Sequence, residues 1–289
     1  MDEDMVFQNY LVVFFDILGQ KEALKKIGEI PSSELEKQKF LESIRESIGV
    51  VLKLRGAFNA FFKATLDSHS TNENLVAPKH RKKFVASLKE GRIFYSLSDA
   101  TVIAVPLTDE NENCTAINGV YSAFTATCGI GLLAFADGVS IRAGLDVGVA
   151  TEIGDGGHEI YGPALERTIY IEKELAEYPR FLVGEKALNY LTWVDNQKYK
   201  TKCGEIAKCT ARRCRKMIIQ DTDGWFMLDF LGESAREALG QKKETFKIAV
   251  NSAQNFVKSQ YEKYTGNRND KLSSRYFRLL RYFQSKQSI

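Results

Sequence analysis

The segment YLVVFFDILG, residues 10–19, is a run of β-branched and aromatic residues that ends in an aspartate and a glycine. Its apolar part is too continuous for a strand with one exposed face, which would alternate apolar and polar residues. We therefore expect a central strand buried on both faces, with Asp16 near its end and Gly19 closing it. A carboxylate at the end of a buried strand needs a cap, a cation or a hydrogen-bond partner, because desolvating it alone costs several kcal/mol.

A second carboxylate follows in residues 92–106, RIFYSLSDATVIAVP, which consist of two strand-like pieces around Ser98 and Asp99. This pattern predicts a β-hairpin with Asp99 at its tip. Taken singly, Asp16 also fits a helix cap and Asp99 a turn residue. If the first strand lies beside the hairpin, both carboxylates reach one edge of the sheet, where they can share hard cations.

The remaining pattern alternates helices with short strands. Helical periodicity covers residues 20–54, and the polar, turn-rich stretch at 66–83 is expected to be an inserted loop. The later elements are expected to be a helix at 115–135, a strand at 139–150, a glycine-rich loop at 151–162, a helix from Pro163, a strand at 180–184 and a strand at 225–231. This order predicts an α+β fold with a ferredoxin-like sheet and helices on one face.

The chain is expected to divide into a catalytic-size domain over residues 1–232 and a C-terminal helical extension over 233–289, with two helical stretches. The last stretch spaces three arginines, at 275, 278 and 281, among aromatic residues. Packing of these aromatics on the domain or on a second subunit is favoured over a nucleic-acid or membrane contact. The segment 200–216 has seven basic residues against one acid, and a solvated loop is favoured there over a triphosphate contact.

The composition is that of a globular protein. The 289 residues are 44% hydrophobic and 27% charged, which argues against a disordered or membrane-embedded chain. The net charge of +3 is too small to indicate a nucleic-acid partner. The N-terminus is acidic where a secretory signal would be basic, and no stretch approaches the roughly 18 apolar residues of a membrane span. The five cysteines lack Cys-x-x-Cys spacing, so we expect free thiols in a reducing cytoplasm.

Several segments together resemble the class III nucleotidyl cyclases. VFFDILG at 13–19 resembles the metal-binding first strand of that family, and SLSDATVIA at 96–104 resembles its hairpin with the second metal aspartate. Residues 140–188 follow the family's later strand, glycine loop, helix and strand, so that the resemblance covers roughly residues 8–232. Within the family, the chain is most similar to the bacterial pyrimidine cyclases of the Pycsar antiphage system. This similarity lies in the single-domain length, the Ile-Leu-Gly form of the first motif and the Gly-Pro-Ala-Leu helix start at 162–165.

The resemblance implies conversion of UTP, favoured over CTP, to 3′,5′-cyclic UMP or cyclic CMP and pyrophosphate, as a second messenger in bacterial antiphage defence. The implied mechanism is a two-metal in-line displacement with Mn²⁺ or Mg²⁺ held by Asp16, Asp99 and the carbonyl of Ile17. One ion would lower the pKa of the ribose 3′-hydroxyl, and the other would neutralise the triphosphate and the leaving pyrophosphate. The product would reach a separate cyclic-nucleotide-sensing effector.

Four further residues are implied to contact the substrate. The backbone amides of Leu18, Gly19 and Gln20, at the mouth of a helix, suit the β- and γ-phosphates. Four residues before the hairpin aspartate, purine cyclases of the family carry Lys for adenine or Glu for guanine, whereas this chain has Tyr95. A phenol is bulky and offers one donor/acceptor group, which fits a pyrimidine better than a purine. The alternative is a strand aromatic with its hydroxyl in solvent.

Two positions differ from the family pattern. Glu166 stands where purine cyclases have an Asn that contacts the ribose, and Tyr170 stands where they have a transition-state arginine. Arg167 lies three residues before Tyr170 on the same helix face and is the candidate substitute. The family's sites form between two domains arranged head to tail, which implies a homodimer. An adenylate or guanylate cyclase, and a catalytically inactive cyclase-homology domain that binds a nucleotide, remain open as alternatives.

Overall fold

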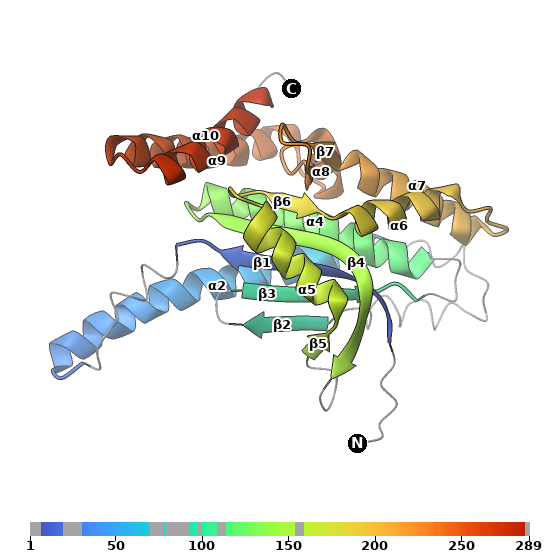
Figure 1. The fold of residues 1–289 in the computed structure, drawn as a ribbon, viewed down its shortest axis with the longest axis horizontal. Coiled ribbons are helices and arrows are strands. Elements are labelled where there is room, and N and C mark those ends of the chain that lie inside the picture. The colour runs from blue at the N-terminus through green and yellow to red at the C-terminus, as the bar shows by residue number, and fades with distance from the viewer. Residues whose placement is uncertain are drawn as a thin grey trace.

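A mixed β-sheet forms the centre of the fold, in the strand order β2-β3-β1-β4-β6-β8-β7, with β5 paired to β4 (Figure 1). The computed structural model describes residues 7–19, 31–69, 78, 93–97, 100–108, 114–153 and 159–286. The strands are β1 Gln8–Ile17, β2 Ile93–Leu97, β3 Ala100–Pro106, β4 Ile141–Ile153, β5 Glu159–Tyr161, β6 Phe181–Val183, β7 Ile218–Gln220 and β8 Phe226–Leu228. β4 and β6 run parallel, and the other pairs are antiparallel.

Helices cover both faces of this sheet. They are α2 Glu34–His69, α4 Cys114–Ala136, α5 Pro163–Tyr170, the π-helix η2 Ile171–Leu175, α6 Glu185–Asn196, α7 Lys202–Lys216, α8 Glu233–Ala238, α9 Lys243–Gly266 and α10 Asp270–Ser285. The order β1-α2-β2-β3-α4-β4, with β1 between β3 and β4, is the ferredoxin-like arrangement. The expected α+β class and the C-terminal helices are therefore confirmed, although α5 adds a helix on the second face.

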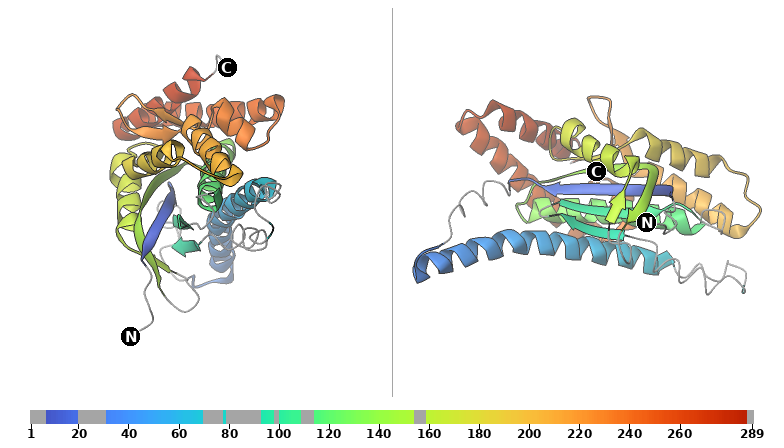
Figure 2. Two further views of the ribbon diagram at one scale, coloured as in Figure 1. Left: turned by 90° about the vertical axis from the view of Figure 1, so that its right-hand side faces the viewer. Right: turned by 60° about the horizontal axis from the view of Figure 1, so that its bottom comes forward.

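Strand β1 buries side chains on both faces, as its sequence predicts. Leu11, Val13 and Phe15 belong to the large core that includes α2 and α4. Val12 and Phe14 belong to a smaller core beneath α5. Figure 2 shows the sheet between α5 on one side and α2 with α4 on the other. Alternating side chains point to opposite faces of a strand, so a strand covered on both faces must be apolar throughout.

Helix α4 is long and apolar enough to cross a membrane by length and composition, over Ala116–Ala136, contrary to the expectation that no stretch approaches such a span. Most of this helix is buried within the protein, where it packs between the sheet and α2, α7 and α9. Its apolar composition is therefore accounted for by its position in the core.

The helix expected to end at residue 54 continues to His69, into the first residues of the predicted polar insert at 66–83. Leu54, Phe58 and Phe62 extend its buried stripe at spacings of four, and Phe58 stacks on Phe15 with ring centroids 6.0 Å apart. Residues 20–30, and 70–83 apart from Pro78, lie outside the described residues.

The basic segment 200–216 is helix α7 rather than the solvated loop that its charge suggests. Cys203, Ala207, Ala211 and Cys214 recur at helical spacing, and all four are buried. The basic residues occupy the other faces of the helix, so the charge marks a solvated face and not a loop. The described part of the C-terminal extension, residues 233–286, forms three helices rather than two, since Gly240 with φ +63° separates α8 from α9.

The C-terminal helices share the core of the sheet. Phe246, Val257 and Phe283 belong to the same buried cluster as the α2–α4 face of β1. Phe283 meets Phe135 of α4 edge to face, with centroids 6.2 Å apart. The aromatic residues of α10 thus pack on the rest of the chain, as favoured above, and the domain boundary at residue 232 stays a prediction.

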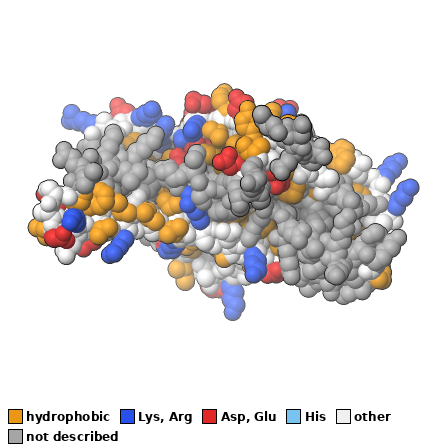
Figure 3. All heavy atoms as spheres, turned by 90° about the horizontal axis from the view of Figure 1, so that it is seen from below, with side chains coloured by type: hydrophobic (Ala, Val, Ile, Leu, Met, Phe, Trp, Pro, Cys, Tyr) orange, Lys and Arg blue, Asp and Glu red, His pale blue; other side chains and the backbone are white. Residues whose placement is uncertain are grey.

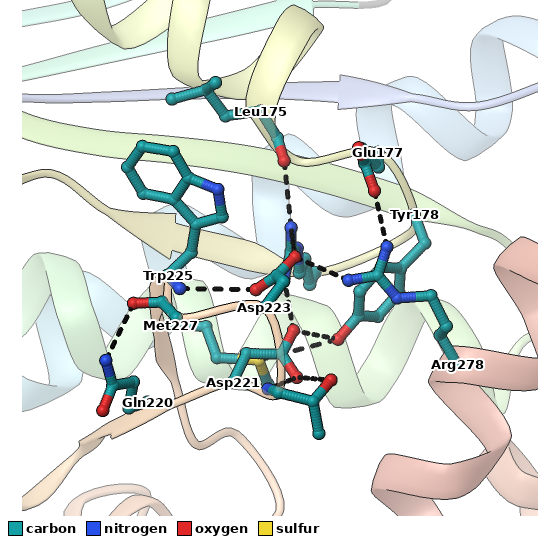
Figure 4. Close-up of polar contacts among 12 residues, drawn as sticks. Leu175, Glu177, Tyr178, Gln220, Asp221, Asp223, Trp225, Met227 and Arg278 are labelled. Carbon is teal, nitrogen blue, oxygen red and sulfur yellow. Dashed lines mark hydrogen bonds and ion pairs between the residues drawn. The ribbon is translucent and has the colours of Figure 1, made fainter.

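A charged network attaches α10 to the β7–β8 hairpin (Figure 4). The fully buried Arg180 pairs with Asp221 and, at 2.7 Å, with Asp223. Arg278 of α10 pairs with Asp223 and Glu177, at 2.5 Å each. Burial by itself would raise the pKa of Asp223, but the hydrogen bond and charge of Arg180, together with hydrogen bonds from Arg278 and the Trp225 amide, lower it from 3.8 to about 2.

We expect Asp223→Asn to destabilise the protein in a pH-dependent way. Because the folded-state pKa of Asp223 lies below the unfolded value of 3.8, its contribution is present above pH 3.8 and is lost as the pH falls toward 2. In urea unfolding, the gap between wild type and Asp223→Asn should therefore be largest near neutral pH and shrink below about pH 4. Asp137→Asn, which removes an exposed ion pair with Lys53, is the control and should have a small effect. A gap that stays constant from pH 7 to pH 3 would contradict the assignment.

Candidate active site

Asp16 ends the row of side chains that β1 directs toward α5. Val12 and Phe14 in this row are buried, whereas Asp16 is partly exposed. The antiparallel ladder pairs Asp16 with Arg142 of β4, and directly opposite residues of a sheet share a face. The strand end predicted to hold a metal ion therefore has an arginine beside its carboxylate.

Arg142 is bound to a buried carboxylate. Its guanidinium lies 2.7 Å and 2.9 Å from Oε1 of Glu172, whose side chain is fully buried. Burial raises the pKa of Glu172, the charge of Arg142 opposes that change, and the charge of Asp16 adds to it. Within the part of the chain that the structure describes, Oε2 of Glu172 has no hydrogen-bond partner. Asp16, Arg142 and Glu172 thus form one charged cluster at this edge.

The backbone geometry around η2 explains how Glu172 reaches Arg142. α5 continues directly into η2, where the amide of Ala176 donates to the carbonyl of Ile171 at 2.9 Å, five residues back. Beneath this turn lies Gly144 of β4, where an added Cβ would come within 2.4 Å of the carbonyl oxygen of Thr168. Only glycine lets η2 approach β4 so closely, and that approach sets Glu172 over Arg142.

The hairpin lies beside β1 as predicted. β3 begins at Ala100 and pairs Thr101 with Phe15, so the start of β3 lies at the same end of the sheet as Asp16. β2 pairs Tyr95 with Val102, and the structure describes Tyr95 for its backbone only. Asp99 and Gln20 lie outside the described residues.

The predicted phosphate-binding amides follow directly after β1. The Leu18 amide donates to the carbonyl of Ser140 at 2.8 Å, so this donor is already used within the protein. Gly19 is exposed and has φ +92°, which glycine adopts without strain. Ser140 also shares a buried 2.7 Å hydrogen bond with the hydroxyl of Tyr276, and this bond ties α10 to the strand end.

Arg167, the candidate transition-state cation, lies farther along β4. Its Nε is 2.7 Å from Oδ2 of the buried Asp146, and it donates to the carbonyl of Val147 at 3.1 Å. Asp146 pairs with Val12 in the β1–β4 ladder, four residues from the Asp16 pair and therefore about 13 Å away along the strand. The structure thus does not bring Arg167 to Asp16 within one chain.

Asp146 also fixes the start of α6. Its Oδ1 accepts a hydrogen bond from the amide of Ala187 at 2.8 Å, in the first turn of that helix. Gly184 makes room for this carboxylate, since an added Cβ there would lie 2.3 Å from Cγ of Asp146. The Asp146–Arg167 pair therefore joins β4, α5 and α6.

The donors at the strand end are hard oxygens, which fits Mn²⁺ or Mg²⁺. The Asp16 carboxylate is partly exposed at this point, and the carbonyl of Ile17 follows it in the chain. Among the described residues, no group of three or more His, Cys, Asp or Glu side chains could hold a metal ion. The described donors therefore amount to part of a site, which Asp99 would have to complete.

Sequence reasoning did not find Arg142, Glu172 or Asp146. Period-two alternation over the strand at 139–150 places Arg142 and Asp146 on one face, and this signal was available. The burial of Glu172 has no local sequence signal, because the surrounding IEKEL is typical of an exposed helix.

Comparison with models of known protein families finds no match to this chain, and neither does comparison with curated proteins. Among solved structures, the chain is similar to a bacterial light-regulated adenylyl cyclase, with 12% identity and a TM-score of 0.39, covering 88% of this chain and 58% of that one. It is similar to the adenylyl cyclase CyaB from P. aeruginosa, with 14% identity and a TM-score of 0.36, covering 66% of this chain and 84% of that one. A further light-regulated adenylyl cyclase structure shares 11% identity, with a TM-score of 0.38, covering 86% of this chain and 99% of that one. At this level of similarity, the case for a function depends on the residues of this chain.

We expect Arg167→Ala to lower the free energy of unfolding by about 1–3 kcal/mol, because Asp146 would keep a buried charge without its cation. The double variant Asp146→Asn/Arg167→Ala should recover part of this loss in urea unfolding. Arg212→Ala, which removes a partly exposed pair with Asp195, is the control and should cost less than about 1 kcal/mol. If Arg167 also acts on the substrate, the double variant will be more stable than Arg167→Ala but will have the same reduced turnover. Full turnover in Arg167→Ala would exclude that role.

Proposed function

We propose that this protein is a nucleotidyl cyclase that converts UTP, or CTP, to the 3′,5′-cyclic nucleotide and pyrophosphate. One observation carries the proposal: Asp16 is partly exposed at the end of the buried strand β1, beside the start of β3. Asp99, which lies outside the described residues, directly precedes Ala100, the first residue of β3, in the sequence. Two carboxylates at one sheet edge suit a pair of hard cations.

Asp16, Asp99 and the Ile17 carbonyl would hold two Mn²⁺ or Mg²⁺ ions. When bound, the ions would lower the pKa of the ribose 3′-hydroxyl and balance the charge of the triphosphate. The protein would contribute binding and orientation: the amides of Gly19, in an exposed turn, and of Gln20 would donate to the β- and γ-phosphates. Leu18 would take part only if its amide left the carbonyl of Ser140.

Tyr95 would select the base. It lies on β2, the strand directly beside β3, and its backbone pairs with that of Val102 on β3. A phenol provides bulk and one hydrogen-bonding group, which favours the smaller pyrimidine ring. Cyclic UMP is favoured over cyclic CMP, and the role in cytoplasmic antiphage signalling through a separate effector follows from the resemblance alone.

The catalytic form would be a head-to-tail homodimer. Arg167 lies about 13 Å along β4 from Asp16, and Arg142, beside Asp16, is already paired with Glu172, so the proposal takes the transition-state arginine from a second chain. Glu166 and Tyr170 are exposed on α5, where a partner could contact them. Apolar side chains are also exposed on α2, at Leu35, Leu41, Ile48 and Leu52. Figure 3 shows hydrophobic side chains gathered at one end of the molecule. Leu41, Ile48 and Leu52, at spacings of seven and four, share one face of the helix, and such an exposed apolar stripe is typical of an interaction surface.

The deciding experiment incubates the purified protein with each of ATP, GTP, UTP and CTP plus Mn²⁺ and identifies the products by mass spectrometry. We expect cyclic UMP or cyclic CMP, and a loss of about 100-fold or more in rate for Asp16→Asn and for Asp99→Asn, because each removes a metal ligand. Asp270→Asn, at the exposed start of α10, is the matched control and should keep wild-type turnover.

Other outcomes would change the assignment. Cyclic AMP or cyclic GMP as the only product would indicate a purine cyclase and overturn the role of Tyr95. Metal-dependent nucleotide binding without any product would indicate a catalytically inactive cyclase-homology domain, the reading that Glu166 and Tyr170 favour. If Asp16→Asn and Asp99→Asn change neither turnover nor metal-dependent binding, the two-metal site is wrong.

A further inference from the structure

A cavity of about 380 Å³ lies among the C-terminal helices, far along the chain from Asp16. It is lined by residues of α8 and α9, by Leu231 before α8 and by Lys286 at the end of α10, a group of helices at the top of Figure 1. This volume lies at the lower end of the range of small-molecule sites, about 300–1,000 Å³. Nothing in the proposed cyclase reaction uses it.

The inner wall of the cavity is apolar. Leu231 and Phe246 are buried, and Val250 is half-buried one turn further along α9. Phe246 and Val250 are four residues apart, so both lie on the same face of that helix. An apolar wall of this kind binds the hydrocarbon part of a ligand through burial of surface area.

The outer wall is strongly basic. Its charged residues are one carboxylate, Glu233, and the four cations Arg236, Lys243, Lys247 and Lys286. Arg236 pairs with Glu233 at 2.8 Å, and Lys286 pairs with Asp229 at 2.6 Å. Lys243 and Lys247 are exposed, four residues apart on α9, and have no ion-pair partner among the residues that the structure describes. Two like charges at this spacing repel each other, and an anion between them would remove the repulsion.

The position of these lysines at the start of a helix adds to the excess of positive charge. Lys242 and Lys243 begin α9, where the helix dipole is positive, and Lys242 provides no side-chain cap. Cations are unfavourable at such a position, and the one acid in this first turn, Glu244, does not line the cavity. The charge distribution therefore favours an anion at the mouth of the cavity.

We propose that this cavity binds a small amphipathic anion, with an aliphatic or ring body and one carboxylate or phosphate head group. The body packs against Leu231, Phe246 and Val250, and the head group pairs with Lys243 and Lys247. This site is independent of the cyclase proposal, since it shares no residue with it.

Isothermal titration calorimetry on the full chain tests the proposal with octanoate and octyl phosphate, each below its micellar concentration. The two probes distinguish a carboxylate from a phosphate head group. Octyl glucoside has the same chain without the charge, and inorganic phosphate has the charge without the chain. We expect one site per chain for at least one charged probe, and binding at least about tenfold weaker for octyl glucoside and inorganic phosphate.

The double variant Lys243→Ala/Lys247→Ala should weaken binding of the charged probe about tenfold. Both side chains are exposed, so the variant is expected to keep the wild-type circular dichroism spectrum and thermal midpoint. Lys258→Ala/Lys263→Ala removes the same charge from α9 outside the cavity and should leave the affinity unchanged. Octyl glucoside binding as tightly as octyl phosphate, an equal loss in both double variants, or no binding of either charged probe would overturn the proposal.

Discussion

Strand β1 buries side chains on both of its faces, so each face of the sheet needs its own cover of helices. α2 and α4 provide that cover on one side and α5 on the other. A strand in this position cannot carry a charge until its end, because an unpaired buried carboxylate costs several kcal/mol. Asp16 lies at the first position where the charge is tolerated, beside Arg142 and at the start of β3. The same constraint that makes the core apolar thus concentrates polar chemistry at one edge of the sheet.

Buried ion pairs then fix the elements around that edge. Glu172 holds Arg142, and Asp146 holds Arg167 together with the first turn of α6. Arg180 and Arg278 do the same for the β7–β8 hairpin and α10. Removing the partner of a fully buried member, such as Glu172 or Arg180, would be costly because the remaining charge stays buried.

Helix α10 connects two distant parts of the molecule. Near its start, the Tyr276 hydroxyl binds Ser140, whose carbonyl accepts the Leu18 amide next to the candidate site. At its end, Tyr282 and Lys286 bind Asp229, and Lys286 lines the basic cavity. A single helix therefore reaches from the end of β1 to the proposed anion site. The C-terminal extension thus helps to build the core that covers the sheet.

The sequence by itself determined the central strand, the hairpin, the ferredoxin-like order and the position of Asp16, because periodicity and turn residues are local signals. It misassigned 200–216, since charge alone does not distinguish a loop from the solvated face of an amphipathic helix such as α7. Only the tertiary structure decided that Glu172 is buried against Arg142, that the Leu18 amide is occupied and that Arg167 lies far from Asp16. Each of these depends on which segments distant in the chain pack together, and that contact has no signature in the neighbouring residues.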